Sequence, residues 1–448
     1  MEKNLTSGSV FKTILYFSLP YLLSYFLQTL YGMADLFIIG QFNGTASTTA
    51  VSIGGQVMHM LTVMIVGLAM GSTVMIGRFV GGGNKKYANL AVGNTATLFM
   101  TLSVICTILL LLVVKPIVSV MSTPSEAVEG TAAYLTICFI GIPFITAYNI
   151  ISSVFRGMGD SKSPMYFIAV ACVFNIILDY IFIGIWGLGA AGAALGTTLS
   201  QTISVIVSFA VILKRRMIPG ISASDFKPDK SMLSDILKVG FPVAIQDGFI
   251  QIAFIVITIF ANRRGLNDAA AVGIVEKLIG VIFLVPSSML STVSALSAQN
   301  IGAGKHERAS LTLKYSTFIA VGFGVIVSIL MQFMAEAAVG LFAEDFNVIM
   351  LGGQYMRSYV WDCVFAGIHF CFSGYFCAYG LSGISFLHNS ISIIFARIPL
   401  AYIASVYFTE SLFPMGIAAP AGSALSVIIC IAAFVWMKRN RNRFIKVS

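Results

Sequence analysis

The sequence predicts an all-α polytopic membrane protein with twelve transmembrane helices in two six-helix bundles that are related by pseudo-two-fold symmetry. Of its 448 residues, 58% are hydrophobic and only 10% are charged, whereas about a quarter of the residues in a soluble domain are charged. Apolar runs of about 20 residues, the length that a helix needs to cross a bilayer, recur between polar or Gly/Pro breaks. The second half of the chain also repeats features of the first half.

Twelve apolar runs are long enough to be transmembrane helices, and this even number places both termini on the same side. They fall near residues 11–39, 49–78, 88–115, 130–155, 163–184, 188–213, 236–262, 269–298, 309–334, 350–379, 385–408 and 414–437. The only substantial break is charged, carries Pro219 and Pro228, and predicts a cytoplasmic linker with a short interfacial helix from Lys230. The expected parts are an N-terminal lobe (1–213), the linker (214–235), a C-terminal lobe (236–438) and a basic cytoplasmic tail (439–448).

The distribution of basic residues predicts the orientation in the membrane. The formal net charge is +9, and most of the 27 Lys and Arg fall on the side that holds both termini. The opposite side receives only Lys115, Arg263, Arg264 and Arg357. Because basic residues accumulate in cytoplasmic loops, we expect a multi-pass protein of the cell (inner) membrane with both termini in the cytoplasm. The basic excess therefore sets the topology and does not indicate nucleic-acid binding.

The halves of the chain are expected to be copies of one another. VGGGNKKYA at 80–88 recurs as IGAGKHERA at 301–309, and ILYFSLP at 14–20 recurs as ILKVGFP at 236–242. These matches have nearly constant offsets of 221 and 222 residues. With six helices in each half, the copies insert in the same orientation, which is typical of transporters that handle substrate between two bundles.

Carboxylates inside the predicted spans mark a candidate site in the first half. Asp35 lies in a long apolar segment, where a charge costs about 2.5 to 3.5 kcal/mol near the bilayer centre. Asp179 lies in the fifth span at a similar expected depth, one helical turn after Asn175. The alternative is that both acids only end their helices at the water interface. Further polar candidates in this half are Gln28, Asn149, Thr197, Thr198 and Gln201.

The second half carries different polar residues. At the repeat-equivalent positions of Asp35 and Asp179 stand Ile257 and Leu400. Glu276 and Lys277 are adjacent and point in different directions on a helix, so each needs another partner. The other polar candidates in the spans of this half are Asp247, Gln251, Asp362, His369 and Arg397, and the carboxylate that pairs with Arg397 is left open.

Several classes of protein are disfavoured by missing motifs. The chain has no GxxxxGK[ST] phosphate loop, no HExxH, no Cys/His metal spacing and no GxSxG, so we expect neither an ATP-driven pump nor an enzyme, and no cofactor. The seven cysteines lack a pairing pattern and read as buried thiols. Most of the 35 Phe and 20 Met should face lipid, while a minority could line a soft surface for flat apolar cations.

The order and spacing of several segments resemble the multidrug and toxic compound extrusion (MATE) family of secondary transporters, and most of all its bacterial MepA-like branch. These segments are SLPYLLSYFLQTLYGMADLFIIG, the GGGNKKYA and GAGKHERA turns, FRGMGDSKSP, NIILDYIFI, GLGAAGAALGT and ARIPL. The resemblance implies two six-helix lobes, a functional monomer, and export of organic cations or amphipathic drugs in exchange for inward Na⁺ or H⁺.

The resemblance also implies a coupling-cation site in the N-terminal lobe. This site falls on Asp35 and Asp179, with Gln28, Asn175 and Thr197 as polar neighbours and Asn149 as a looser match. Some family members use an acid in the C-terminal lobe. Here Asp247 or Gln251 and Asp362 stand near that region but out of register, which favours the N-terminal lobe.

The identity of the coupling ion stays open at this stage. Removal from water favours the neutral form of a carboxyl group, so Asp35 or Asp179 could take up a proton. The oxygens of Asp35, Asp179 and Asn175 could instead hold Na⁺, a hard cation that prefers oxygen ligands. Two other functions also remain as alternatives: a lipid-linked saccharide flippase of the same superfamily, and a receptor or membrane enzyme that transports nothing.

Overall fold

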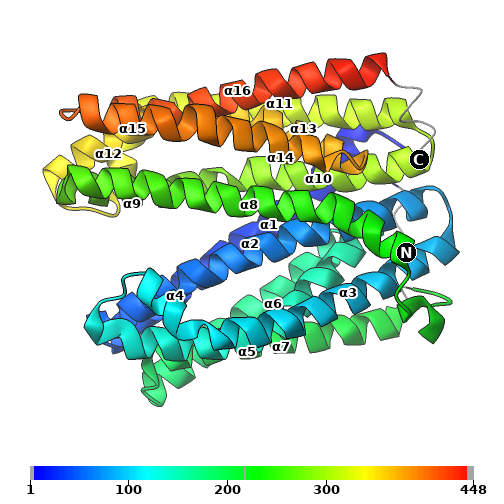
Figure 1. The fold of residues 1–448 in the computed structure, drawn as a ribbon, viewed down its shortest axis with the longest axis horizontal. Coiled ribbons are helices and arrows are strands. Elements are labelled where there is room, and N and C mark those ends of the chain that lie inside the picture. The colour runs from blue at the N-terminus through cyan, green and yellow to red at the C-terminus, as the bar shows by residue number, and fades with distance from the viewer. Residues whose placement is uncertain (1–4, 216–217, 441–448) are drawn as a thin grey trace. The chain divides into compact units, whose positions relative to one another are not determined.

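The computed structural model describes residues 5–215 and 218–440, and within these ranges every regular element is helical. The chain forms two compact units. Unit 1 comprises Leu19–Gly240, and unit 2 comprises Leu5–Ser18 together with the chain from Phe241 onward. Figure 1 shows the long helices of each unit running beside one another. Some basic residues on the side of the termini lie outside the described residues. They are Lys3, Arg216 and those of the expected basic tail after residue 440.

The helical segments have the following bounds. Those of unit 1 are α1 (Val10–Phe42, which begins in unit 2), α2 (Thr45–Gly81), α3 (Lys85–Leu112), α4 (Val114–Val120), η1 (Ser125–Ala127), α5 (Val128–Gly157), α6 (Lys162–Asp179), η2 (Tyr180–Ile185), α7 (Gly189–Arg215) and η3 (Ala223–Phe226). Those of unit 2 are α8 (Lys230–Arg264, which begins in unit 1), α9 (Leu266–Ile282), α10 (Leu284–Gly302), α11 (His306–Gly340), α12 (Phe346–Tyr359), α13 (Asp362–Ala378), α14 (Ser382–Ser392), η4 (Ile393–Arg397), α15 (Ile398–Tyr407) and α16 (Phe413–Arg439).

Each predicted span has a helical counterpart, which confirms the all-α membrane fold. In the described part of the chain, eleven helical segments are long and apolar enough to cross a bilayer, and α12 and α13 pass together as a pair bent by 41°. Several spans are interrupted rather than straight. Short π-helical segments, η2 and η4, follow α6 and α14, and such segments widen the helix locally and often accompany functional sites.

The linker differs from its prediction in two ways. The expected short interfacial helix from Lys230 is instead the start of α8, which continues without interruption to Arg264. The segment before it is fastened to α3 by the buried Asn94, whose amide group donates to the backbone oxygens of Asp225 and Lys227 and accepts from the backbone nitrogen of Asp229. The linker therefore belongs to unit 1. A buried amide that satisfies three backbone groups of another segment holds that segment in place.

The repeated turns adopt the same backbone conformation in both halves. Gly83 and Gly304 have φ angles of +71°, a left-handed conformation that glycine adopts without steric cost. In each turn the next residue closes a backbone hydrogen bond, from Asn84 to Phe79 at 2.9 Å and from Lys305 to Asn300 at 2.7 Å. The sequence repeat is therefore also a structural repeat.

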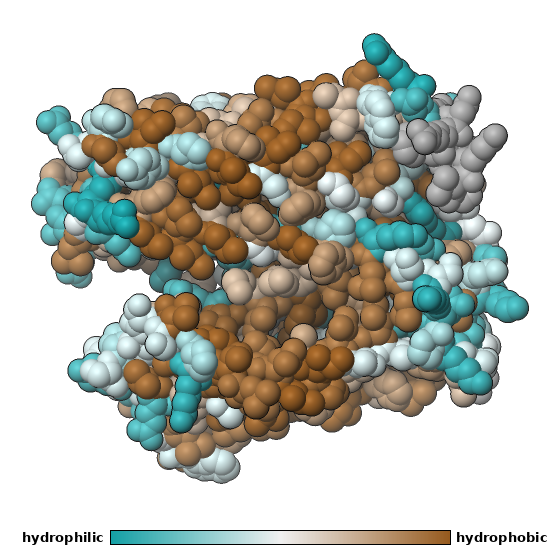
Figure 2. All heavy atoms as spheres, in the orientation of Figure 1, coloured by the Kyte–Doolittle hydropathy of each residue, from teal (hydrophilic) through white to brown (hydrophobic). Residues whose placement is uncertain are grey.

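The packing of unit 1 fixes the helices that carry the candidate acids. Ile39 of α1, Phe139 of α5 and Ala193 of α7 are fully buried in one apolar cluster that α2 also joins through Ala50. In unit 2 a corresponding cluster includes Ile257 of α8. On the face shown in Figure 2, apolar side chains cover the middle of each unit, and hydrophilic side chains gather at the helix ends. This distribution suits a bilayer, where apolar surfaces face lipid and tight packing holds the helices together.

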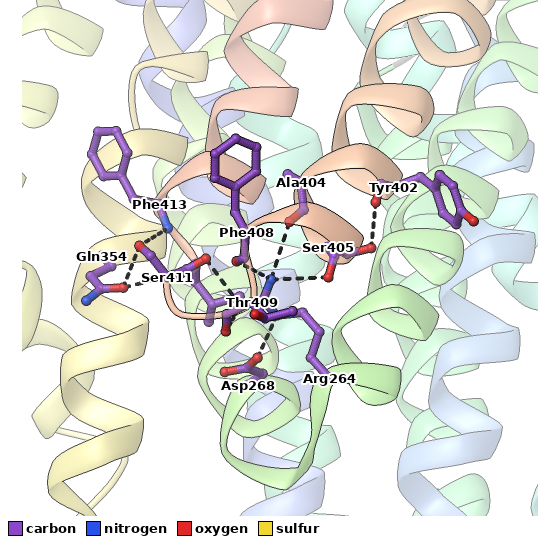
Figure 3. Close-up of polar contacts among 11 residues, drawn as sticks. Arg264, Asp268, Gln354, Tyr402, Ala404, Ser405, Phe408, Thr409, Ser411 and Phe413 are labelled. Atoms are coloured by element: carbon purple, nitrogen blue, oxygen red, sulfur yellow. Dashed lines mark hydrogen bonds and ion pairs between the residues drawn. The ribbon is translucent and has the colours of Figure 1, made fainter.

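At one end of unit 2, Arg264 ties the end of α8 to the loop that follows α15 (Figure 3). Its guanidinium group donates to Asp268 Oδ2 at 2.6 Å and to the backbone oxygens of Phe408, Thr409 and Ser411 at 2.9, 3.0 and 3.2 Å. The Arg264 side chain is only 5% exposed. One arginine thus satisfies carbonyl groups that the end of a helix leaves without partners.

We expect Arg264→Met to destabilise unit 2 strongly. The substitution leaves the Asp268 carboxylate and several carbonyl groups without their partner, and removal of one member of a buried ion pair costs about 3 to 5 kcal/mol. The melting temperature of the purified protein in detergent should fall. The matched control is Arg263→Met, which removes the exposed neighbouring arginine. Equal melting temperatures for the two variants would contradict the assignment.

Candidate functional site

Asp35 is buried near the end of α1 and is held by a residue of α7. Only 4% of its surface is exposed, and its Oδ2 accepts a hydrogen bond from the Thr197 hydroxyl at 3.1 Å. Asp35 is therefore not an acid that ends its helix in water, because α1 continues to Phe42. The predicted pairing of Asp35 with a polar residue of the sixth span exists in the folded chain.

Asp179 and Asn175 of α6 face the same carboxylate. Both are fully buried, lie one helical turn apart, and interact with the Asp35 side chain. Asp179 is the last residue of α6 before the π-helical segment η2. Since a π-turn rotates the residues that follow it relative to a regular helix, the change of helix type at this point lets Asp179 face α1 while the segment beyond it packs on α7.

A glycine of α7 makes room for Asp179. A Cβ atom added to Gly196 would overlap Asp179 Oδ1, so any larger residue would displace this carboxylate. Nearby, Gly192 lies against the backbone of Phe182. The small residues of GLGAAGAALGT therefore permit close contact between α6–η2 and α7, and they bring Asp179 next to Asp35.

The cluster contains polar atoms without hydrogen-bond partners. Among the described residues, these buried atoms include Asp35 Oδ1, both carboxylate oxygens of Asp179, both polar amide atoms of Asn175 and Gln201 Oε1. Most of them are acceptors. Buried polar groups are normally satisfied, and exceptions need an explanation such as an ion or a functional role. The chemical character of this cluster is that of a site for a proton or a small hard cation.

The remaining residues predicted for this site lie further away. Gln28 is seven residues before Asp35, which is about 10 Å along the helix, and it interacts with Tyr148 of α5. The Asn149 amide group donates to the backbone oxygen of Ile145 in its own helix at 2.8 Å. The structure thus brings Asp35, Asp179, Asn175 and Thr197 together and places Gln28 and Asn149 outside that group.

Sequence reasoning overlooked part of the surroundings of Asp35. Tyr31, one turn earlier on α1, interacts with both Asp35 and Gln201. Tyr134 and Cys138 of α5 also lie near enough to Asp35 to interact with it. The spacing of four residues between Tyr31 and Asp35 was a usable signal for a shared helix face. The two residues of α5 carried no such signal.

The polar residues of unit 2 form a separate cluster around Arg397. Its Nη2 lies 3.8 Å from Asp362 Oδ2 and donates a hydrogen bond to the Tyr359 hydroxyl. Glu276 is electrostatically close to Arg397 and accepts a hydrogen bond from Thr258 at 3.3 Å. The partner of Arg397, which the sequence left open, is therefore Asp362, with Glu276 nearby. In unit 2 a guanidinium group supplies a positive charge to the acids, whereas among the described residues no Lys or Arg forms an ion pair with the acids of unit 1.

The other candidates in unit 2 are dispersed. Asp247 is near Cys377, and Gln251 is half-buried on α8. His369 is buried with its ring 5.6 Å from that of His388, and His388 contacts the Ser373 hydroxyl at 2.9 Å. Within the described ranges, no group of three or more His, Cys, Asp and Glu residues could hold a metal ion.

The positions expected to correspond to the acids are apolar in unit 2. Ile257 is 2% exposed in the core of unit 2. Leu400 is 41% exposed, and the adjacent Ala401 is fully buried. A π-helical segment, Ile393–Arg397, lies before Leu400, whereas in the fifth span the π-helical segment follows Asp179. Neither Leu400 nor Ala401 carries an acid.

Two units of long apolar helices, one of them with a buried pair of acids, define a polytopic membrane transport protein. The sequence model of the MatE family matches residues 20–181 and 242–403. The chain belongs to this family of multidrug transporters, and so it is not an enzyme. The two matches are offset by 222 residues, which confirms the internal repeat.

Known proteins resemble the chain over most of its length. The probable multidrug resistance protein YoeA of Bacillus subtilis (strain 168) is 26% identical, over 98% of this chain and 96% of that protein. The multidrug export protein MepA of Staphylococcus saprophyticus is 25% identical, over 82% of this chain and 81% of that protein. The crystal structure of MATE in complex with MaL6 has a TM-score of 0.88 and 24% identity, with 99% of each chain covered. This structure shows that the two share a fold.

Proposed function

We propose that the chain is an antiporter that exports organic cationic or amphipathic drugs by alternating access, and that Asp35 and Asp179 hold the coupling cation. The observation that carries this proposal is the contact of two buried carboxylates on different helices, with three of their four oxygens lacking a hydrogen-bond partner. The names of the relatives, multidrug resistance protein and multidrug export protein, support the class of substrate.

Two adjacent carboxylates out of water require a positive charge. Two like charges close together in a medium of low dielectric constant repel strongly, so the pair cannot be fully ionised without compensation. Unit 2 contains Arg397 beside its acids, whereas in unit 1 no Lys or Arg of the described residues forms an ion pair with Asp35 or Asp179. The compensating charge in unit 1 is therefore the transported proton or Na⁺.

Coupling follows if the cation and the drug favour opposite states of the protein. A ligand shifts an equilibrium only by its differential affinity for the two states. An inward proton gradient supplies about 1.4 kcal/mol per pH unit, and the membrane potential supplies about 2.3 kcal/mol per charge per 100 mV. Either source sustains a drug gradient of about tenfold or more.

Both cations fit the donor set of the cluster. A proton shared between two carboxyl groups removes their repulsion, as in other carboxylate pairs. The oxygens of Asp35, Asp179, Asn175 and Thr197 are also the ligand type that a hard cation such as Na⁺ prefers. Because the ligand chemistry fits both ions, the transport assay distinguishes between them.

The topology completes the proposal. We place both termini in the cytoplasm and the protein in the cell membrane, because Lys and Arg concentrate on the side of the termini. The moving bodies are the lobes 1–213 and 236–438, and one chain is sufficient for transport. The charged linker, which is anchored on α3, joins the first lobe to the second.

The proposal is tested with purified protein in proteoliposomes that contain a fluorescent cationic dye such as ethidium. Na⁺ and pH gradients are imposed separately, and a labelled phospholipid is included in a parallel set. We expect dye to move against one of these two cations, with no movement when both gradients are absent. Scrambling of the labelled lipid without dye transport would favour a flippase instead, and the absence of all ion-dependent transport would contradict antiport.

A further inference from the structure

A line of polar side chains runs along α1 toward Asp35. Tyr21, Tyr25, Gln28, Tyr31 and Asp35 follow one another at intervals of three or four residues. This spacing places them on one side of the helix. In a membrane helix, polar residues on one side turn away from lipid. The line begins one residue after Pro20, in the basic end of unit 1, and it ends at the acid pair.

A matching set of residues lies across from this line on α5. Arg156, Ser152 and Tyr148 are spaced four residues apart. The Arg156 guanidinium carbon lies 4.0 Å from the centre of the Tyr21 ring, and Arg156 also interacts with Tyr25 and Tyr148. Ser152 is 1% exposed and interacts with the Tyr148 side chain. The two polar faces therefore meet between α1 and α5.

Electrostatic interactions link Arg156 with the acid pair through the residues between them. Tyr148, which interacts with Arg156, also interacts with Gln28 and with Tyr31. Tyr31 in turn interacts with Gln201 and with Asp35. Hydroxyl and amide groups in such a series can pass a proton or solvate a small cation. We name the residues Tyr21, Tyr25, Gln28, Tyr31, Tyr148, Ser152 and Gln201 the polar file of unit 1.

Arg156 places a single positive charge at the end of the polar file that lies away from the acid pair. Arg156 is only 8% exposed, and within the described residues no carboxylate forms an ion pair with it. Its contacts are aromatic faces and hydroxyl groups of tyrosines. Desolvating a guanidinium group without a counter-ion is expensive. An arginine in such a position repels cations, as in water channels where an arginine excludes protons.

The other half of the chain, which lacks the acid pair, also lacks part of this file. With the offset of 222 residues, Tyr21 corresponds to Val243, Gln28 to Ile250 and Tyr31 to Ala253. Arg156 corresponds to Cys377, since Gly159 donates to the Arg156 carbonyl in the same way that Gly380 donates to the Cys377 carbonyl. Three positions of the file stay polar, because Tyr25 corresponds to Asp247, and Tyr148 and Ser152 correspond to His369 and Ser373. The acid pair and the residues of α1 next to it, Gln28 and Tyr31, thus occur together in unit 1 and are replaced by apolar residues in unit 2.

We infer that the polar file connects the acid pair with the basic end of unit 1 as an internal route for the coupling cation, and that Arg156 is the charged barrier that keeps this route closed to leakage. This inference rests on the proposed function, because it takes the acid pair to be the cation site. The route lies inside unit 1. The cation therefore reaches the acids by a route that is separate from the path of the substrate.

The test measures cation leak through Arg156→Gln in proteoliposomes without any drug. An inside-negative potassium diffusion potential drives uptake, which is read with a proton-sensitive dye and, in a second set, with a sodium-sensitive dye. Local charge changes ion access by about 10- to 1,000-fold, so we expect the variant to leak at least about tenfold faster than the unsubstituted protein. Arg156→Lys keeps the charge and should stay nearly tight. Arg357→Gln, which removes an arginine paired with Glu336 in unit 2, is the matched control.

Adding Gln28→Leu and Tyr148→Phe to Arg156→Gln should abolish the leak, because these changes keep the side-chain volume and interrupt the file. A tight Arg156→Gln variant that remains folded, or a leak that survives the added substitutions, would overturn the inference. If Arg156→Gln fails to insert, the double variant Gln28→Leu/Tyr148→Phe, which keeps Arg156, tests the route instead. We expect its cation-coupled dye transport to fall about tenfold. Unchanged transport in this double variant would overturn the route. Leak is read without dye, so a failure of dye transport by the unsubstituted protein counts against the proposed function separately.

Discussion

Asp35→Asn is expected to abolish cation-driven export while the protein still folds and inserts. The asparagine keeps a polar side chain of the same shape and can still accept the hydrogen bond from Thr197. It cannot bind or release a proton, and it contributes no negative charge to hold Na⁺. Because it also removes a buried charge, folding should not suffer. A pH difference of one unit, which sustains about a tenfold drug gradient in the unsubstituted protein, should sustain none.

The measurement is ethidium efflux from cells that express equal amounts of each variant, with membrane insertion checked by fluorescence-detected gel filtration. Glu129→Gln, which neutralises an exposed acid of unit 1, is the control and should export normally. Efflux by Asp35→Asn at the rate of the unsubstituted protein would remove Asp35 from the coupling mechanism. Loss of efflux in the control as well would point to a general effect of charge.

Gly196→Ala is expected to reduce export about as severely, although it changes no charge. The added methyl group would occupy the space of Asp179 Oδ1, which must then move away from Asp35. Displacement of a catalytic or binding group by about 1 Å can cost about 100-fold in rate. The folded state should tolerate the change, because alanine is the better helix former. We therefore expect loss of transport with normal melting temperature.

Gly32→Ala is the matched control, since this position lies on α1 near Asp35 and an added Cβ would have no atom within 4 Å. It should transport normally. The affinity for the coupling cation, measured from the cation concentration that gives half-maximal dye transport, should fall in Gly196→Ala only. If Gly196→Ala transports at the normal rate and with normal cation affinity, the placement of Asp179 against Asp35 is not what the site requires.

The transmembrane spans could be predicted because composition alone determines which segments enter a bilayer. Breaks inside the spans could not. The 41° bend between α12 and α13 falls at Val360 and Trp361, inside what the sequence predicted as one span, 350–379. The same holds for the π-helical segments η2 and η4, which interrupt the fifth and the eleventh span. Bends of this kind depend on contacts with neighbouring helices, and hydropathy carries no information about them.

The acids of the candidate site could be found from sequence because an ionisable residue inside a span is costly and rarely without a role. Their mutual contact depends on how α1, α6 and α7 pack, which the glycine-rich start of α7 only suggested. The partner of Arg397 could not be read, since Asp362 lies on another helix of unit 2. Likewise, the charge and the prolines of the linker predicted a cytoplasmic segment, but they did not show that Asn94 of an apolar helix fastens it to unit 1.

Cation release on drug binding tests the coupling role of the acid pair most directly. Purified protein in detergent is mixed with a cationic dye in weakly buffered solution, with a pH indicator for protons and radioactive sodium for Na⁺. We expect the unsubstituted protein to release one of these cations as dye binds, and Asp35→Asn and Asp179→Asn to bind dye without releasing any. Release by both variants equal to that of the unsubstituted protein would contradict a coupling site at this pair.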